Sequence, residues 1–146
     1  MEKDYSDRPH SELTEQIIGI FYVVYNELRF GFLESVYQRA MFIAHRDAGL
    51  SVHREVEISV SFRSHEVGVF RCDLLVENSV LLELKAIDRL ESSREAQVLN
   101  YLRATRIEIG LLLNFGRHPQ VRRLAFDNQR KISVHQRLSA ASPGGV

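Results

Sequence analysis

Three charged residues interrupt two otherwise apolar segments of the sequence. Asp73 lies within Phe-Arg-Cys-Asp-Leu-Leu-Val, and Glu83 and Lys85 lie within Leu-Leu-Glu-Leu-Lys-Ala. Charged side chains are rarely buried in such segments unless they are paired or bind a ligand. Two carboxylates can hold a hard cation such as Mg²⁺, and a lysine beside them can position water or stabilise phosphate charge. The alternative is an edge strand on which Glu83 and Lys85 are solvated, and the E-x-K pattern by itself favours that alternative.

The two segments are predicted to form a β-hairpin that brings these residues together. Both have the composition of strands, and residues 77–79 between them have that of a tight turn. Because strand side chains alternate, Glu83 and Lys85 point to one face, with Asp73 close to Glu83 across the strand pair. Cys72 then faces the opposite way and is interpreted as a small core hydrophobe.

Hydrophobic periodicity predicts an α/β fold, a mixed sheet with helices on its faces. The expected helices are 13–29, 33–48 and 92–106, and the expected strands are 52–62, 67–76, 80–86 and 107–115, with short strands at 121–126 and 132–134. The nearly continuous apolar run in the strand 107–115 indicates burial on both faces. The helix before it is the usual means of returning to a sheet in parallel.

Local signals set the expected limits of these elements and the expected core. Ser11 or Thr14 is expected to cap the first helix, and Ser92 with Glu95 matches a capping box. Gly49 is expected to end the second helix in a left-handed conformation. Two further groups complete the prediction: a strand-ending turn at Asn114 and Gly116, and inward-facing Phe21, Val36, Tyr37, Ala40, Met41, Phe42, Ala44 and Phe62.

Polar residues on two predicted helices could join the charged hairpin. Gln97 and Tyr101 are four residues apart, so they share one face of their helix. Glu34 begins the second helix shortly after Gly31, where an acid also favours the helix dipole. Taken singly, Glu34 is explained by that dipole, Gln97 by a surface position and Tyr101 by half-burial.

Length and composition favour one globular domain in a reducing compartment. We expect an arm at residues 1–10, a domain at 11–138 and a flexible tail at 139–146. No apolar run approaches the roughly 18 residues that cross a bilayer, and the acidic N-terminus is unlike a signal peptide. The only cysteine, Cys72, cannot form an internal disulfide, which favours the cytoplasm. The six histidines are scattered, which argues against a zinc site.

The charge distribution is uneven although the net charge is zero, with 19 basic and 19 acidic residues. Residues 117–139 contain six Lys/Arg and one acid, Asp127. This third of the chain could follow a phosphate backbone. A solvated surface explains the same pattern and is the interpretation we favour from sequence alone.

The segment Gly31-Phe32-Leu33-Glu34-Ser35-Val36-Tyr37 resembles the signature of the GxxExxY protein family, which is grouped with the PD-(D/E)XK nuclease superfamily. The resemblance covers roughly residues 13–116. It implies a restriction-endonuclease-like core, which runs helix, three strands, helix, strand. The other matching fragments are Leu13-Thr14-Glu15-Gln16-Ile17-Ile18-Gly19, Asp73-Leu74-Leu75-Val76, Glu83-Leu84-Lys85-Ala86, Glu95-Ala96-Gln97 and Leu112-Leu113-Asn114-Phe115-Gly116.

The resemblance also implies functional roles. Glu34 matches the helix glutamate of the superfamily's first motif, Asp73 and Glu83 match its metal-binding acids, and Lys85 matches its lysine. The main-chain carbonyl of Leu84 is a further expected metal contact. The Gln97-x-x-x-Tyr101 pair is similar to a motif that lies beside the metal and the DNA strand in nuclease domains of bacterial recombination helicases and related exonucleases. The implied cofactor is Mg²⁺ or Mn²⁺, and the implied activity is hydrolysis of phosphodiester bonds in nucleic acid, with DNA preferred.

The sequence departs from the family just before the signature. Tyr25 stands where the family has a histidine, and Arg29-Phe30 replaces its Gly-Pro turn. Any role of that histidine therefore does not transfer to this chain.

Two other hypotheses stay open at this point. The chain could keep the nuclease fold without useful turnover and act as a nucleic-acid-binding or regulatory module, because fold does not settle function. It could also work only with a partner or as a homodimer, since small sites often need a second copy to hold both strands of a duplex.

Overall fold

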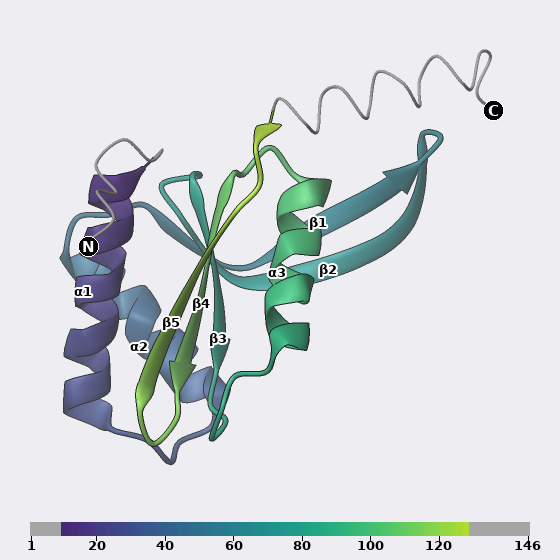
Figure 1. Cartoon of the computed structure of the whole chain (residues 1–146). Helices are drawn as coiled ribbons and strands as arrows, with labels where there is room; N and C mark the ends of the chain where they lie inside the picture. Colours follow the sequence, from purple (N-terminus) through teal and green to yellow (C-terminus); the bar gives the residue numbers. More distant parts are fainter. Residues whose placement is uncertain (1–9, 129–146) are drawn as a thin grey trace, which may run out of the picture.

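The computed structural model describes residues 10–128, which form one mixed sheet with helices on both of its faces (Figure 1). The predicted order of helices and strands is confirmed. The elements are α1 (Ser11–Leu28), α2 (Glu34–Asp47), β1 (Val52–Phe62), β2 (His65–Val76), β3 (Val80–Lys85), α3 (Ser92–Ala104), β4 (Ile109–Phe115) and β5 (Pro119–Ala125). Residues 1–9, the strand expected at 132–134, the domain limit at 138 and the tail at 139–146 lie outside the described residues.

The five strands follow the order β1-β2-β3-β4-β5 across the sheet. Neighbours are antiparallel except β3 and β4, which are parallel and are joined through α3. A parallel pair needs such a crossover because its second strand must start at the same end as the first. β4 is buried at every position, as its apolar run predicted.

Two apolar cores lie on opposite faces of the sheet. In the larger core, α1 and α2 pack on one face, and Tyr37 stacks on Phe115 with ring centres 4.1 Å apart. Phe21 contacts the same Phe115 ring edge-on at 4.8 Å. The smaller core places Val98 and Leu102 of α3 against the other face. The central strands are therefore covered on both sides, so any charged group on them needs a specific partner.

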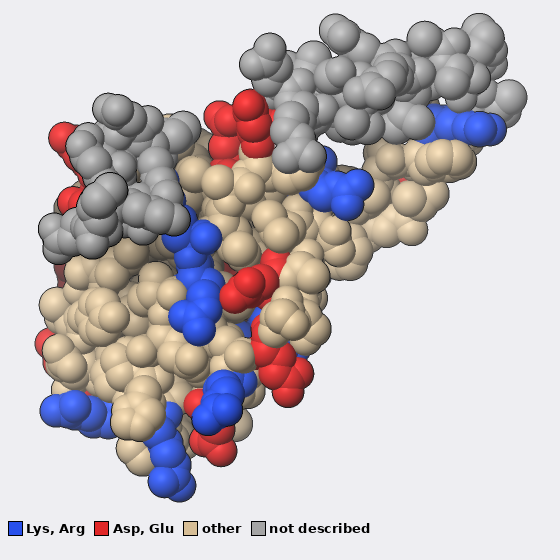
Figure 2. All heavy atoms as spheres, in the orientation of Figure 1, with Lys and Arg blue, Asp and Glu red and all other residues tan. Residues whose placement is uncertain are grey.

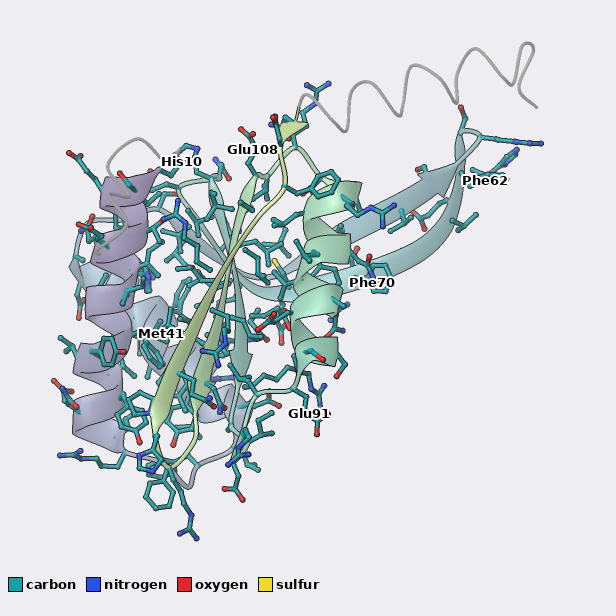
Figure 3. The ribbon with its side chains drawn as sticks, in the orientation of Figure 1. His10, Met41, Phe62, Phe70, Glu91 and Glu108 are labelled. Atoms are coloured by element: carbon teal, nitrogen blue, oxygen red, sulfur yellow. The ribbon has the colours of Figure 1, made fainter. Side chains whose placement is uncertain are left out.

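The β1–β2 hairpin extends beyond α3 as a long arm (Figure 1). Phe62 lies near the far end of this arm and Phe70 lies beside α3 (Figure 3). Phe62 is 51% exposed, so its predicted core position is wrong. Alternation tells which face a side chain occupies, but the arm projects past the side of α3, so this helix does not cover its far end (Figure 1). Val36 is likewise exposed, at the start of α2.

Local signals for helix and strand limits were partly right. Gly49 adopts a φ of 79° just after α2, and Leu50 N–H donates to the His45 carbonyl, which confirms the predicted stop. The capping box at Ser92 is wrong, because Glu91 is the N-cap of α3 and no described side chain caps it. The cap expected for α1 is also wrong. Its N-cap is His10, and Thr14 is buried inside the helix.

Asn114 does not end a strand in a turn, as the sequence suggested, but lies buried within β4. Its side-chain amide accepts from Ile87 N–H at 3.0 Å and donates to the Ile87 carbonyl at 2.8 Å. The amide also donates to Gln120 Oε1 at 3.0 Å, and that oxygen accepts from Leu90 N–H at 3.2 Å. These bonds fix the connection between β3 and α3. Gly116 lies close to the same connection, because a Cβ there would be 2.3 Å from the Ile87 carbonyl oxygen.

We expect Asn114→Ala to lower the free energy of unfolding by about 2–3 kcal/mol, because it leaves the peptide groups of Ile87 without their partner. Urea denaturation followed by circular dichroism measures this change. Asn100→Ala is the matched control, since Asn100 is exposed on α3. Equal stabilities of the two variants would contradict a structural role for Asn114.

Candidate active site

Glu83 and Lys85 lie on β3, between β2 and β4. Their neighbours Leu82 and Leu84 belong to the core under α1 and α2. Glu83 therefore faces α3, as alternation predicted, and it is only 5% exposed. The solvated edge strand is excluded as an explanation of this glutamate, since β3 is an inner strand.

Asp73 lies where β2 and β3 separate. The backbone ladder between the two strands stops at the pair Leu74–Leu82, one step short of Asp73 and Glu83. Side-chain bonds continue across the gap. Leu84 N–H donates to Asp73 Oδ2 at 2.7 Å, and Asp73 N–H donates to Glu83 Oε1 at 3.2 Å.

β2 changes the face that it presents at Asp73. Cys72 belongs to the core under α3, whereas Leu74, two residues later, belongs to the core under α1 and α2. Regular alternation would put both on one face. Cys72 is fully buried, and burial raises the pKa of its thiol to about 12, so it stays protonated as a core residue.

The backbone of Leu84 faces the same gap. The N–H and C=O groups of a strand residue point toward the same neighbouring strand. Because Leu84 N–H reaches Asp73, its carbonyl is directed to that side of β3 as well. Two carboxylates and one carbonyl thus lie at the point where the strands separate.

Burial makes both carboxyl groups hard to ionise. Burial and then the neighbouring Asp73 charge raise the pKa of Glu83 to about 8. Burial also raises the pKa of Asp73, and the hydrogen bond from Leu84 N–H acts in the opposite direction. Lys85 favours ionisation of both groups without outweighing the burial. The Lys85 charge is therefore not enough to offset burial of the pair, and a bound cation would favour the ionised form of both acids.

Glu34 lies beside Lys85 and not among the other carboxylates. Its Oε1 is 3.7 Å from Lys85 Nζ, and the Lys85 side chain is only 17% exposed. Within residues 10–128 no three His, Cys, Asp or Glu side chains come close enough to share one metal ion. The acids that the structure brings together are thus Asp73 and Glu83, with Glu34 linked to them through Lys85.

Gln97 and Tyr101 lie on the face of α3 that covers Glu83. Burial and then the Glu83 charge raise the pKa of Tyr101, whereas a side-chain hydrogen bond with Gln97 lowers it. The Tyr101 ring also packs against the Phe70 ring, with ring centres 5.3 Å apart. Tyr101 is 4% exposed, so the half-buried position expected for an unconstrained tyrosine does not apply.

Gln38 is a site residue that the sequence reasoning missed. Its Nε2 donates to Asp73 Oδ1 at 3.1 Å, which fixes the orientation of that carboxylate from α2. The available signal was its spacing, since Gln38 follows Glu34 by four residues and so lies on the same face of the helix.

Tyr37 has a structural position. Tyr37 is fully buried, and its hydroxyl donates to the Arg29 carbonyl and accepts from Phe32 N–H at 3.3 Å. Tyr25 is hydrogen-bonded through its hydroxyl to the carbonyls of Gly116 at 2.8 Å and Arg117 at 2.7 Å. Both tyrosines therefore fix loops at the end of the molecule where α2 begins.

Comparison with known protein families matches residues 11–124 to the PD-(D/E)XK nuclease superfamily. Because this match spans most of the chain, the chain belongs to that superfamily, and the membership supports a nuclease. The predicted restriction-endonuclease-like α/β fold is confirmed by this match and by the observed sheet. No curated protein matches the sequence.

One solved structure agrees with this fold, and a second is less similar. The crystal structure of SSO0001 superimposes with a TM-score of 0.50 at 15% identity, over 93% of this chain and 69% of that chain. An alkaline exonuclease (LHK-Exo) from Laribacter hongkongensis has a TM-score of 0.39 at 13% identity, over 73% of this chain and 61% of that chain. At this level of identity the likeness to SSO0001 concerns the fold alone.

Among the described residues, no helix has the length and apolar character needed to cross a membrane.

The raised pKa of Glu83 predicts a pH-dependent stability of the metal-free protein. A carboxyl group has a pKa near 4.3 when unfolded, and folding raises that of Glu83 to about 8. Protonated Glu83 therefore stabilises the fold below about pH 4, and this contribution is lost as the pH rises toward 8. The Glu83→Gln variant keeps this contribution at every pH, because the glutamine amide does not ionise. We expect the Tm of this variant to exceed that of the wild type by on the order of 5 °C at pH 9 and to match it at pH 4.

Differential scanning calorimetry in EDTA measures this difference across the pH range. Glu15→Gln serves as the control because Glu15 is exposed on α1. A constant difference between Glu83→Gln and wild type at all pH values would contradict the raised pKa.

Proposed function

We propose that this chain is a metal-dependent nuclease of the GxxExxY group that hydrolyses phosphodiester bonds in DNA. The observation that carries the proposal is the convergence of the Asp73 and Glu83 carboxylates and the Leu84 backbone where β2 and β3 separate. Superfamily membership supports the same activity. DNA as substrate and the family assignment rest on the resemblance of the sequence.

The donor set fits Mg²⁺ or Mn²⁺. Asp73 and Glu83 would hold the ion through carboxylate oxygens, together with the Leu84 carbonyl. Mg²⁺ typically takes one or two carboxylates and keeps several waters, so a third acidic ligand is not required. The raised pKa values of the two acids indicate a site that gains from added positive charge. When bound, such an ion polarises a phosphoryl oxygen and lowers the pKa of water.

The other residues would place the substrate and the attacking water. The Lys85 ammonium would orient that water and stabilise negative charge on the phosphate. Glu34 would hold the ammonium in place through its ion pair. Gln38 would keep the Asp73 carboxylate in one orientation, and Gln97 would contact the DNA strand from α3, with the buried Tyr101 positioning it through their hydrogen bond.

A nuclease-fold protein that binds nucleic acid without cleaving it is the second candidate. The observation that favours it is the position of Glu34, which pairs with Lys85 and leaves two acids at the strand gap. The neutral net charge of the chain is also compatible with weak or regulated binding of nucleic acid.

We expect Asp73→Asn to reduce Mg²⁺-dependent cleavage of DNA by about 100-fold or more, because one of the two metal-holding carboxylates is lost. Labelled single- and double-stranded oligonucleotides report the cleavage, and calorimetric titration with Mg²⁺ and Mn²⁺ reports metal binding. Asp47→Asn is the control, since Asp47 is exposed at the end of α2. Cleavage by Asp73→Asn at the wild-type rate would refute the site, and no cleavage by a wild type that binds DNA would favour the second candidate.

Lys85→Ala separates turnover from metal binding. We expect kcat to fall about 100-fold while the Kd for Mn²⁺ changes little, because the ammonium acts on water and phosphate and is not a metal ligand. Single-turnover cleavage and calorimetry provide the two values, with exposed Arg46→Ala as the control. Unchanged turnover in Lys85→Ala would remove this lysine from the proposed chemistry.

A further inference from the structure

The loop between α1 and α2 presents large apolar side chains to solvent. This loop, residues 29–33, is called the aromatic loop below. Phe30 is 51% exposed, Phe32 49% and Leu33 77%. It includes the Arg29-Phe30 segment that replaces the family's Gly-Pro turn. Clustered exposed apolar residues usually mark a binding surface.

The exposure of these side chains does not result from a loose backbone. The buried Tyr37 hydroxyl accepts a hydrogen bond from Phe32 N–H and donates one to the Arg29 carbonyl, so it holds the backbone on both sides of Gly31. The Phe32 ring packs edge-on against Tyr37 at 6.1 Å. Gly31, between Phe30 and Phe32, has a φ of 116°, a conformation that suits glycine. The aromatic loop is thus held in one shape by the core while its outer side chains stay in water.

The positively charged Arg117 side chain lies over the aromatic loop. The Arg117 guanidinium carbon is 5.8 Å from the centre of the Phe30 ring. Arg117 belongs to the β4–β5 turn, whose backbone carbonyls accept from the buried Tyr25 hydroxyl. Residues 29–33 and 116–118 together contain two arginines and no acid. The combination of a fixed aromatic ring and a guanidinium suits a ligand with both a π face and negative charge.

The aromatic loop adjoins the candidate active site. Leu33 is the N-cap of α2, and the next residue, Glu34, forms the ion pair with Lys85 at 3.7 Å. The α1–α2 connection, the β4–β5 turn and the end of β3 lie together at the lower end of the molecule (Figure 1). Basic side chains lie beside uncharged surface at this end, with some acids nearby (Figure 2).

We propose that the aromatic loop, with Arg117, is a stacking platform for unpaired bases of single-stranded DNA whose backbone runs to the carboxylate pair. This inference rests on the proposed function, because it takes nucleic acid as the substrate. Bases in a duplex already stack on one another, so the platform favours single strands or frayed ends. Base–aromatic stacking tolerates any sequence, since every base has a π face.

Binding of a single-stranded oligonucleotide that contains 2-aminopurine tests the proposal. The full chain is used in EDTA, so that binding is measured without cleavage. Stacking on a ring quenches the 2-aminopurine fluorescence, and anisotropy gives the Kd. We expect Phe30→Ala to weaken binding about five-fold or more and to remove the quenching. Phe30→Tyr keeps a ring and should bind as the wild type does, whereas Phe30→Leu keeps only apolar area and should behave as Phe30→Ala does.

Phe62→Ala is the matched control, because Phe62 is also 51% exposed but lies far out on the β1–β2 arm. Equal loss of binding in both alanine variants would overturn the proposal. So would wild-type binding by Phe30→Ala, or an equal loss of binding to a blunt duplex. A change of oligomeric state in Phe30→Ala with unaltered DNA binding would identify a protein interface instead.

The proposed function and the stacking platform can fail separately. A wild type that binds single strands through Phe30 but never cleaves with Mg²⁺ or Mn²⁺ would support the platform and refute the nuclease. A wild type that cleaves, with cleavage lost in Asp73→Asn and DNA binding unchanged in Phe30→Ala, would support the nuclease and refute the platform.

Discussion

Two carboxyl groups are buried side by side where β2 and β3 separate, and the rest of the site is arranged around them. Ionised carboxylates without partners are among the most costly groups to bury. The structure offsets part of this cost with backbone N–H groups of Asp73 and Leu84 and with the Lys85 charge. The remainder appears as a raised pKa of both acids. A cation held between the two carboxylates would offset this penalty.

Helices on both faces of the sheet contribute side chains to this site. On one face α2 directs Gln38 to Asp73, and on the other α3 places Tyr101 near Glu83. The connection between β3 and α3 is fixed separately by Asn114 and Gln120, so the helix is held relative to the strand that carries Glu83 and Lys85. Positioning side chains on packed elements in this way keeps a reactive geometry without requiring the loops to order first.

The first turn of α2 links the core to the candidate site. Tyr37 packs on Phe115 and fixes the loop before α2, whereas Glu34, one turn earlier, reaches Lys85 from the start of the same helix. One helix thus anchors itself in the core and contributes to the site at its exposed end. Phe30 lies between the two backbone groups that Tyr37 holds, and both Phe30 and Leu33 are exposed.

The sequence by itself determined the order of the elements, the two-sided burial of β4 and the set of candidate residues, because these depend on local periodicity and spacing. Only the tertiary structure decided that β2 and β3 separate at Asp73, that Glu34 pairs with Lys85 and that Gln38 orients Asp73. It also decided that Phe62 is exposed and that Asn114 fixes a distant connection. Periodicity states which face a side chain occupies, but what covers that face depends on elements far away in the sequence, such as where α3 crosses the β1–β2 hairpin.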